Sequence, residues 1–92
     1  MNLEELRIEI DKCNNEIIGA IKKRFYVTRE IGKIKKDSNL SSYDKSREDK
    51  VINNVRLLAQ NSNLNEDMIE DIFRIIMKQV IIEHEELKNA NK

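Results

Sequence analysis

Residues 3–35 read LEELRIEIDKCNNEIIGAIKKRFYVTREIGKIK, and this stretch decides the fold. Within it, a set of side chains recurs at alternating steps of three and four residues, and all but one of them are apolar. This spacing places them on one face of an α-helix. The members of this face, which we call the first-helix stripe, are Leu3, Leu6, Ile10, Cys13, Ile17, Ala20, Arg24, Val27, Ile31 and Ile34. The spacing predicts one long helix over residues 2–37.

The first-helix stripe is too long for the rest of the chain to cover. At 1.5 Å per residue it runs for about 46 Å, whereas a second helix of roughly 17 residues runs for only about 25 Å. A second copy of the chain is the simplest cover, and two-fold dimers are the commonest closed assemblies. We therefore expect an intertwined two-fold homodimer, wound along this helix.

The remainder of the chain predicts two more helices, over residues 44–60 and 65–89. The 92 residues contain no proline and two glycines, and segments rich in Ser and Asn interrupt the helical pattern at residues 37–43 and 61–65. Asp44 and Asn65 are the expected N-caps. The expected core residues are Val51, Ile52, Val55, Leu58, Ala59, Ile69, Ile72, Phe73, Ile76, Val80 and Leu87. Residues 1–92 are thus expected to form a single all-α domain of three helices.

Charge and composition exclude several classes of function. Lys and Arg number 17 and so do Asp and Glu, so no overall field attracts nucleic acid or an anionic membrane. The lone Cys13, an acidic N-terminus and the lack of a membrane-length apolar run lead us to expect a cytoplasmic protein. The single histidine, His84, lacks a second ligand at zinc-site spacing, so no metal is expected.

Charged residues that break the apolar pattern are the candidate site residues. Arg24 and Lys35 are eleven residues apart, so they lie about 16 Å apart on one helical face and could converge on a small anion. Taken singly, each also has a structural explanation: Arg24 could pair with Glu48, and Lys35 could extend from the helix end. Arg47 and Glu48 could likewise form an ordinary ion pair in the first turn of the second helix.

Two further candidates lie at the margins of apolar faces. Arg7 lies roughly 100° from the centre of the first-helix stripe, where a partner subunit could meet it. His84 lies one turn beyond Val80 on the shoulder of the third helix. Taken alone, Arg7 is an unremarkable exposed arginine, and a histidine placed like His84 is more often a packing residue than a catalyst.

In combination, these residues resemble the all-α class (type II) of chorismate mutase. The resemblance covers nearly the whole chain. It is carried by the order and spacing of Leu6-Arg7, Ile10-Asp11, Arg24, Glu30-Ile31-Gly32-Lys33-Ile34-Lys35 and Asp44-Lys45-Ser46-Arg47-Glu48. The resemblance implies an intertwined homodimer of three-helix chains. It also implies an enzyme that rearranges chorismate to prephenate, in phenylalanine and tyrosine biosynthesis, without a cofactor.

The resemblance further implies a role for each candidate. Arg24, with Arg7 of the partner subunit, would clamp the two substrate carboxylates, and Arg47 would support that clamp. Glu48 and the backbone of Asp44 would take the ring hydroxyl. Lys35 would face a carboxylate and the ether oxygen. His84 would be the second donor to that oxygen, where the family commonly has Gln or Glu, and Val80 would line the site where many members have a small polar residue.

Other functions stay open on the sequence alone. Isochorismate-pyruvate lyase uses the same scaffold, and the same cations would serve its isomeric substrate. A non-catalytic helical dimerisation or regulatory module would keep the fold. Loss of Arg24, Lys35 or Glu48 would favour such a module, but all three are present. A regulatory complex with another shikimate-pathway enzyme is also open.

Overall fold

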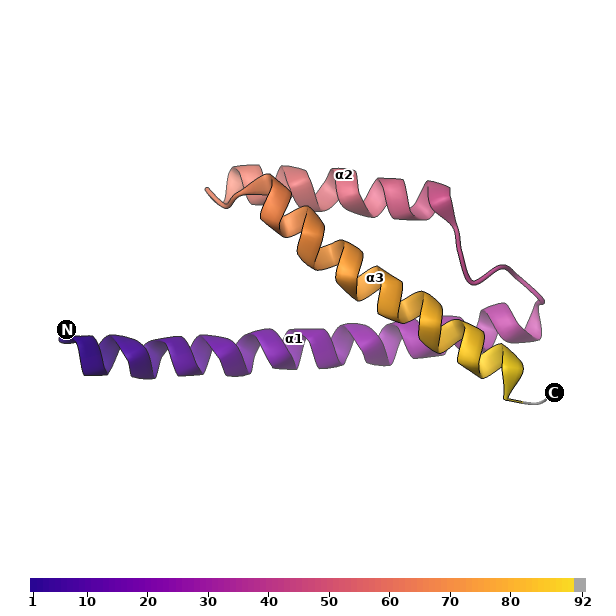
Figure 1. The fold of residues 1–92 in the computed structure, drawn as a ribbon, viewed down its shortest axis with the longest axis horizontal. Coiled ribbons are helices and arrows are strands. Elements are labelled where there is room, and N and C mark those ends of the chain that lie inside the picture. The colour runs from indigo at the N-terminus through magenta and orange to yellow at the C-terminus, as the bar shows by residue number, and fades with distance from the viewer. Residues whose placement is uncertain (91–92) are drawn as a thin grey trace.

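The computed structural model describes residues 1–90 as three α-helices: α1 (Leu3–Asp37), α2 (Lys45–Asn61) and α3 (Glu66–Asn89) (Figure 1). Each predicted helix boundary agrees with the structure to within one residue. No strand occurs in residues 1–90, so the predicted all-α class with a long first helix is confirmed.

Side-chain caps begin all three helices. The Asn2 side chain accepts a hydrogen bond from the backbone N–H of Glu5 at 2.8 Å. Asp44 Oδ1 accepts from the N–H of Arg47 at 3.1 Å, and Asn65 Oδ1 accepts from the N–H of Met68 at 2.8 Å. Each cap satisfies a backbone donor that the helix leaves unpaired, which confirms the predicted caps Asp44 and Asn65.

The same three residues, Ser-Asn-Leu, end both α1 (residues 38–40) and α2 (residues 62–64). In each, the asparagine is left-handed, with φ of 53° at Asn39 and 56° at Asn63. The N–H of the following leucine donates to the carbonyl five residues back, at 2.7 and 2.9 Å respectively. These are C-terminal caps in which asparagine takes the place usually held by glycine.

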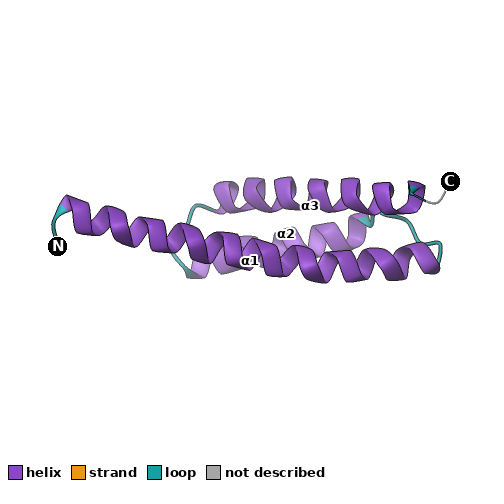
Figure 2. Ribbon diagram, turned by 90° about the horizontal axis from the view of Figure 1, so that it is seen from below, coloured by secondary structure: helices purple, strands orange, loops and turns teal. Residues whose placement is uncertain are grey.

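α3 lies across one side of α1 and α2, so the molecule is two helices deep where they overlap (Figure 2). α3 runs diagonally from α2 to the C-terminal half of α1 and packs against both, whereas α1 and α2 make no direct backbone approach within residues 1–90 (Figure 1). The chain measures 56 × 26 × 15 Å, and the shortest dimension is the direction in which α3 stacks on α1 and α2 (Figure 2). Figure 2 shows the N-terminal half of α1 extending past the other two helices.

The core is small and lies where α3 packs against α2 and α1. The buried residues of the helices are Gly32, Ile52, Val55, Ala59, Met77 and His84. Leu58 and Ile72, which were expected in the core, are exposed in this chain. Met77 was not predicted, because α3 contacts two neighbours and so buries a wider arc than one stripe.

Most of the first-helix stripe is exposed in the single chain. Ile10 and Ile17, for example, are 58% and 54% exposed. This confirms that the rest of the chain leaves the stripe uncovered. None of the helices in residues 1–90 is long and apolar enough to cross a membrane.

Candidate active site

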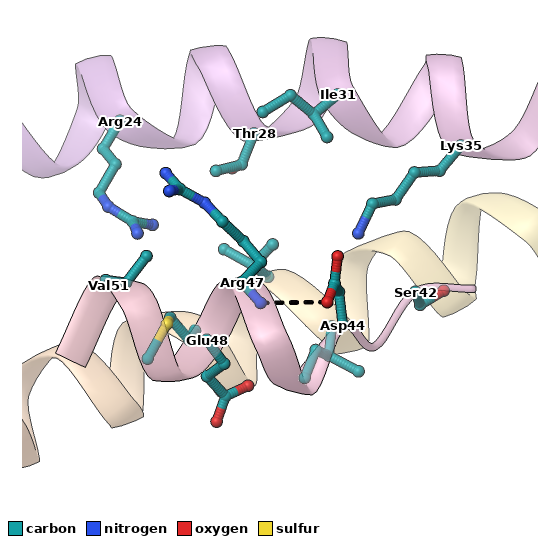
Figure 3. Close-up of a pocket in the computed structure, with 12 residues that line it drawn as sticks. Arg24, Thr28, Ile31, Lys35, Ser42, Asp44, Arg47, Glu48 and Val51 are labelled. Atoms are coloured by element: carbon teal, nitrogen blue, oxygen red, sulfur yellow. Dashed lines mark hydrogen bonds between the residues drawn. The ribbon is translucent and has the colours of Figure 1, made fainter. Parts of the chain in front are cut away.

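A pocket of about 150 Å³ lies between α1 and α2, with α3 behind it (Figure 3). Its lining combines cations and acids from α1 and α2 with apolar side chains. The lining residues are Arg24, Thr28, Ile31, Lys35, Ser42, Asp44, Arg47, Glu48, Val51, Met77, Val80 and Ile81. The structure therefore brings six of the predicted site residues to one place: Arg24, Lys35, Asp44, Arg47, Glu48 and Val80.

Three cations enter this pocket from two helices. Arg24 and Lys35 descend from α1, three turns apart, and the Arg47 guanidinium rises between them from α2 (Figure 3). Arg47 lies in the first turn of α2, where the Asp44 cap holds its backbone N–H. The local cap thus sets the point from which Arg47 reaches the pocket.

Positive charge in this pocket is left unneutralised. Among residues 1–90, no carboxylate lies within 4 Å of the charged nitrogens of Arg24, Lys35 or Arg47. The NH1 atom of Arg24 is buried and has no hydrogen-bond partner within residues 1–90, and its guanidinium carbon lies 5.8 Å from the centre of the Phe73 ring. Burial, and then the nearby Arg47, lower the pKa of Arg24. An anion placed between these groups would accept a hydrogen bond from NH1 of Arg24 and would offset the repulsion between Arg24 and Arg47.

The two acids of the pocket have other partners. The Asp44 carboxylate caps α2, while Glu48 Oε1 lies 3.3 Å from NH1 of Arg74 on α3. Figure 3 shows the Glu48 carboxylate turned away from the three cations. The pairing of Arg24 with Glu48, which the sequence left open, is therefore not formed. Within residues 1–90, no three His, Cys, Asp or Glu side chains gather where they could hold a metal ion.

His84 lies outside the pocket lining, which differs from its predicted position. It is 4% exposed, and its Nε2 lies 2.7 Å from the carbonyl oxygen of Thr28. A carbonyl oxygen only accepts, so Nε2 carries the proton and donates, which leaves the buried Nδ1 without a partner. In this chain His84 packs α3 against α1, and its role as a donor to the substrate stays a prediction.

Gly32 makes this close packing of His84 possible. A Cβ atom at Gly32 would lie 2.7 Å from His84 Cδ2 and 3.0 Å from Nε2. Only a residue without a side chain lets the imidazole approach the α1 backbone this closely. The α1 backbone at Gly32, about one turn before Lys35, is thus fixed against α3.

Arg7 is also absent from the pocket lining. It lies in the exposed N-terminal part of α1, and its separation of 17 positions from Arg24 corresponds to about 25 Å of helix. No arginine side chain spans that distance. Arg7 cannot serve the pocket of its own chain.

Several lining residues were not predicted from the sequence. Thr28 and Ile31 follow Arg24 by four and seven residues, so the helical period that relates Arg24 to Lys35 could have identified both. Ser42 precedes the Asp44 cap and is buried, with its Oγ unpartnered. No sequence signal singles out Ser42, because its burial depends on how the loop lies.

Comparison with known proteins agrees with this geometry. The family model described as chorismate mutase type II matches residues 6–85. The chain is 34% identical over 77 residues to the T-protein of Haemophilus influenzae, which covers 84% of this chain and 20% of that protein, so the chain spans about a fifth of this relative. It is 29% identical over 99 residues to the chorismate mutase of Methanocaldococcus jannaschii, which covers 98% of this chain and 95% of that protein. The family match extends over nearly the whole of the three helices and all the pocket residues, and the chain therefore belongs to the chorismate mutase type II family.

Proposed function

We propose that this chain is a chorismate mutase, an isomerase that converts chorismate to prephenate in aromatic amino acid biosynthesis. The observation that carries the proposal is the meeting of Arg24, Lys35 and Arg47, unpaired, in one pocket. Chorismate is a dianion, and its rearrangement breaks one C–O bond while forming one C–C bond within the molecule. Such a reaction is accelerated by holding the substrate compact and by stabilising developing charge.

Each cation would bind a different part of the substrate. Arg24, whose buried NH1 lacks a partner, would bind one carboxylate, and Arg47 would support it from α2. Lys35 would donate to the ether oxygen, which becomes more negative as the C–O bond breaks. A donor fixed there gains strength in the transition state, so it lowers the barrier rather than merely tightening substrate binding.

The rest of the lining would fix the ring. Glu48 and the backbone of Asp44 would bind the ring hydroxyl, and Val80 would contact the apolar part of the substrate. His84 contributes indirectly, because its packing on Gly32 holds α3 against the turn of α1 that precedes Lys35.

We further propose that the working unit is a two-fold homodimer in which Arg7 of the partner subunit completes each pocket. The exposed first-helix stripe supports a partner along α1. The distance of about 25 Å between Arg7 and Arg24 along one helix supports supply of Arg7 in trans. A second subunit would also cover the side of the pocket opposite α3 (Figure 3).

The decisive experiment is a direct assay of the purified chain with chorismate, monitoring prephenate, alongside an assay with isochorismate, monitoring pyruvate. We expect prephenate formation and no pyruvate. Pyruvate release alone would instead identify the lyase, and no turnover of either substrate by a folded dimer would favour a regulatory module. A regulatory complex with another shikimate-pathway enzyme, and the cytoplasmic location, stay predictions that co-purification and cell fractionation test.

A further inference from the structure

We propose that Arg74 is a positioning residue that keeps Glu48 from neutralising the cations of the pocket. The inference rests on the proposed function only in that the pocket binds a dianion. Arg74 lies on α3, outside the pocket lining, and its NH1 lies 3.3 Å from Glu48 Oε1. Figure 3 shows the result: the Glu48 backbone borders the pocket, but the carboxylate points away from Arg24 and Arg47.

Arg74 is itself held in place by other charges. Its Nε donates to Glu70 Oε2 at 2.8 Å, and the other oxygen of Glu70 accepts from Arg56 NH1 at 2.9 Å. Arg56 in turn reaches Asp67 at 3.0 Å. The Glu70 carboxylate raises the pKa of Arg74 first through the hydrogen bond and then by its charge, with a smaller contribution from Glu48. Glu70, on the same helix, therefore holds the Arg74 guanidinium independently of Glu48.

Of the two carboxylates that contact Arg74, Glu48 makes the longer contact. Its distance to Arg74 is 3.3 Å against 2.8 Å between Arg74 and Glu70, and its side chain is 20% exposed. Glu48 can therefore leave Arg74 to accept a ligand hydroxyl while Glu70 still holds the arginine. With no ligand bound, the contact with Arg74 gives Glu48 an alternative to the unpaired Arg24.

The consequence for the pocket is electrostatic. Glu48 and Arg24 line the same small space, and a carboxylate turned inward would be drawn to the buried guanidinium. That pairing would cancel one of the charges needed to bind a dianion. Arg74 prevents it by competing for the same carboxylate from outside the pocket.

The test is a thermodynamic cycle with succinate, a dicarboxylate that lacks a hydroxyl and so does not use Glu48 as a ligand. Succinate is titrated into four proteins, and its binding is followed by NMR: the wild type, Arg74→Gln, Glu48→Gln and the double variant. Low ionic strength is used because salt then screens the charges only weakly. We expect Arg74→Gln to bind succinate on the order of tenfold more weakly, the effect of losing one charged contact. Glu48→Gln should bind at least as tightly as the wild type, and the double variant should recover wild-type affinity.

The rescue distinguishes positioning from support of the fold. If Arg74 only stabilises the helices, the double variant will stay as weak as Arg74→Gln, and the proposal is overturned. It is also overturned if the wild type shows no succinate binding. Arg56→Gln is the matched control, because Arg56 binds Glu70 and Asp67 but not Glu48, and it should leave affinity within about twofold. The cycle needs no turnover, so a chain inactive on chorismate would refute the proposed function without touching this inference.

Discussion

The two halves of α1 carry the same apolar stripe but have different surroundings. Residues 3–20 are exposed without exception, whereas the segment from Ile21 to Asp37 packs on α3 and supplies Arg24 and Lys35 to the pocket (Figure 1). The sequence period is identical in both halves. A helical period therefore predicts an apolar face that could be covered, but it does not show whether the same chain covers it.

The largest effect is expected from a charge placed on the exposed N-terminal half of α1. Ile17→Glu would put a carboxylate in the proposed dimer interface, where burying it without a partner costs several kcal/mol. We expect loss of the dimer, with unfolding at micromolar concentration, measured by sedimentation and circular dichroism. Ile8→Glu is the matched control, since Ile8 is similarly exposed but lies off the stripe. Equal behaviour of the two variants would argue against the stripe as the interface.

A second prediction sharpens the role of the packed half. Lys35→Ala should lower kcat on chorismate by about 10²–10³-fold, the scale observed when one donor to a developing negative charge is removed. Lys36→Ala, one residue further along the same last turn and outside the pocket lining, should stay near wild type. A Lys35→Ala variant with unchanged kcat would remove Lys35 from the mechanism.

The two glycines of the chain test the comparison directly, because one lies in each half of α1. Gly19→Ala meets no atom within 4 Å in its own chain, so it should stabilise the helix by up to about 1 kcal/mol. Gly32→Ala should destabilise by about 1–3 kcal/mol, because its methyl group collides with the buried His84 ring. Urea denaturation measures both. Adding His84→Ala to Gly32→Ala should recover part of the loss, and a Gly32→Ala variant as stable as the wild type would contradict the packing described.

The smallest effect is expected from Glu70, where α2 and α3 share ion pairs on the surface. Hydrogen bonds from Arg74 and Arg56 lower the pKa of Glu70, so its stabilising contribution is present above the ordinary carboxyl pKa and is lost as pH falls through the lower folded value. The wild type should melt slightly above Glu70→Gln at pH 7, and the gap should close below about pH 4. Asp71→Asn, which removes a neighbouring carboxylate without an ion pair in residues 1–90, should show no such gap. A gap that is constant with pH would exclude the ion pairs as its cause.

What could be predicted from the sequence was local. The helix boundaries and the caps Asp44 and Asn65 follow from residues within one turn of each other. The convergence of Arg24, Lys35 and Arg47 followed from helical spacing together with the family resemblance. By contrast, the partner of Glu48 is an arginine 26 residues away, and the place of His84 depends on how closely α3 approaches Gly32. Such contacts depend on the distance and angle between helices, which no local pattern specifies.

The paired Ser-Asn-Leu stops bear on the order of events in folding. Because each closes its helix through bonds to the last turn alone, α1 and α2 end at the same residues whether or not α3 is in place. The connections between helices are then defined early, by contacts close in sequence, which form quickly. In the proposed dimer, covering the N-terminal half of α1 must wait for a collision between two chains. Refolding should therefore show a fast phase that is independent of protein concentration, followed by a slower phase whose rate rises as the protein becomes more concentrated.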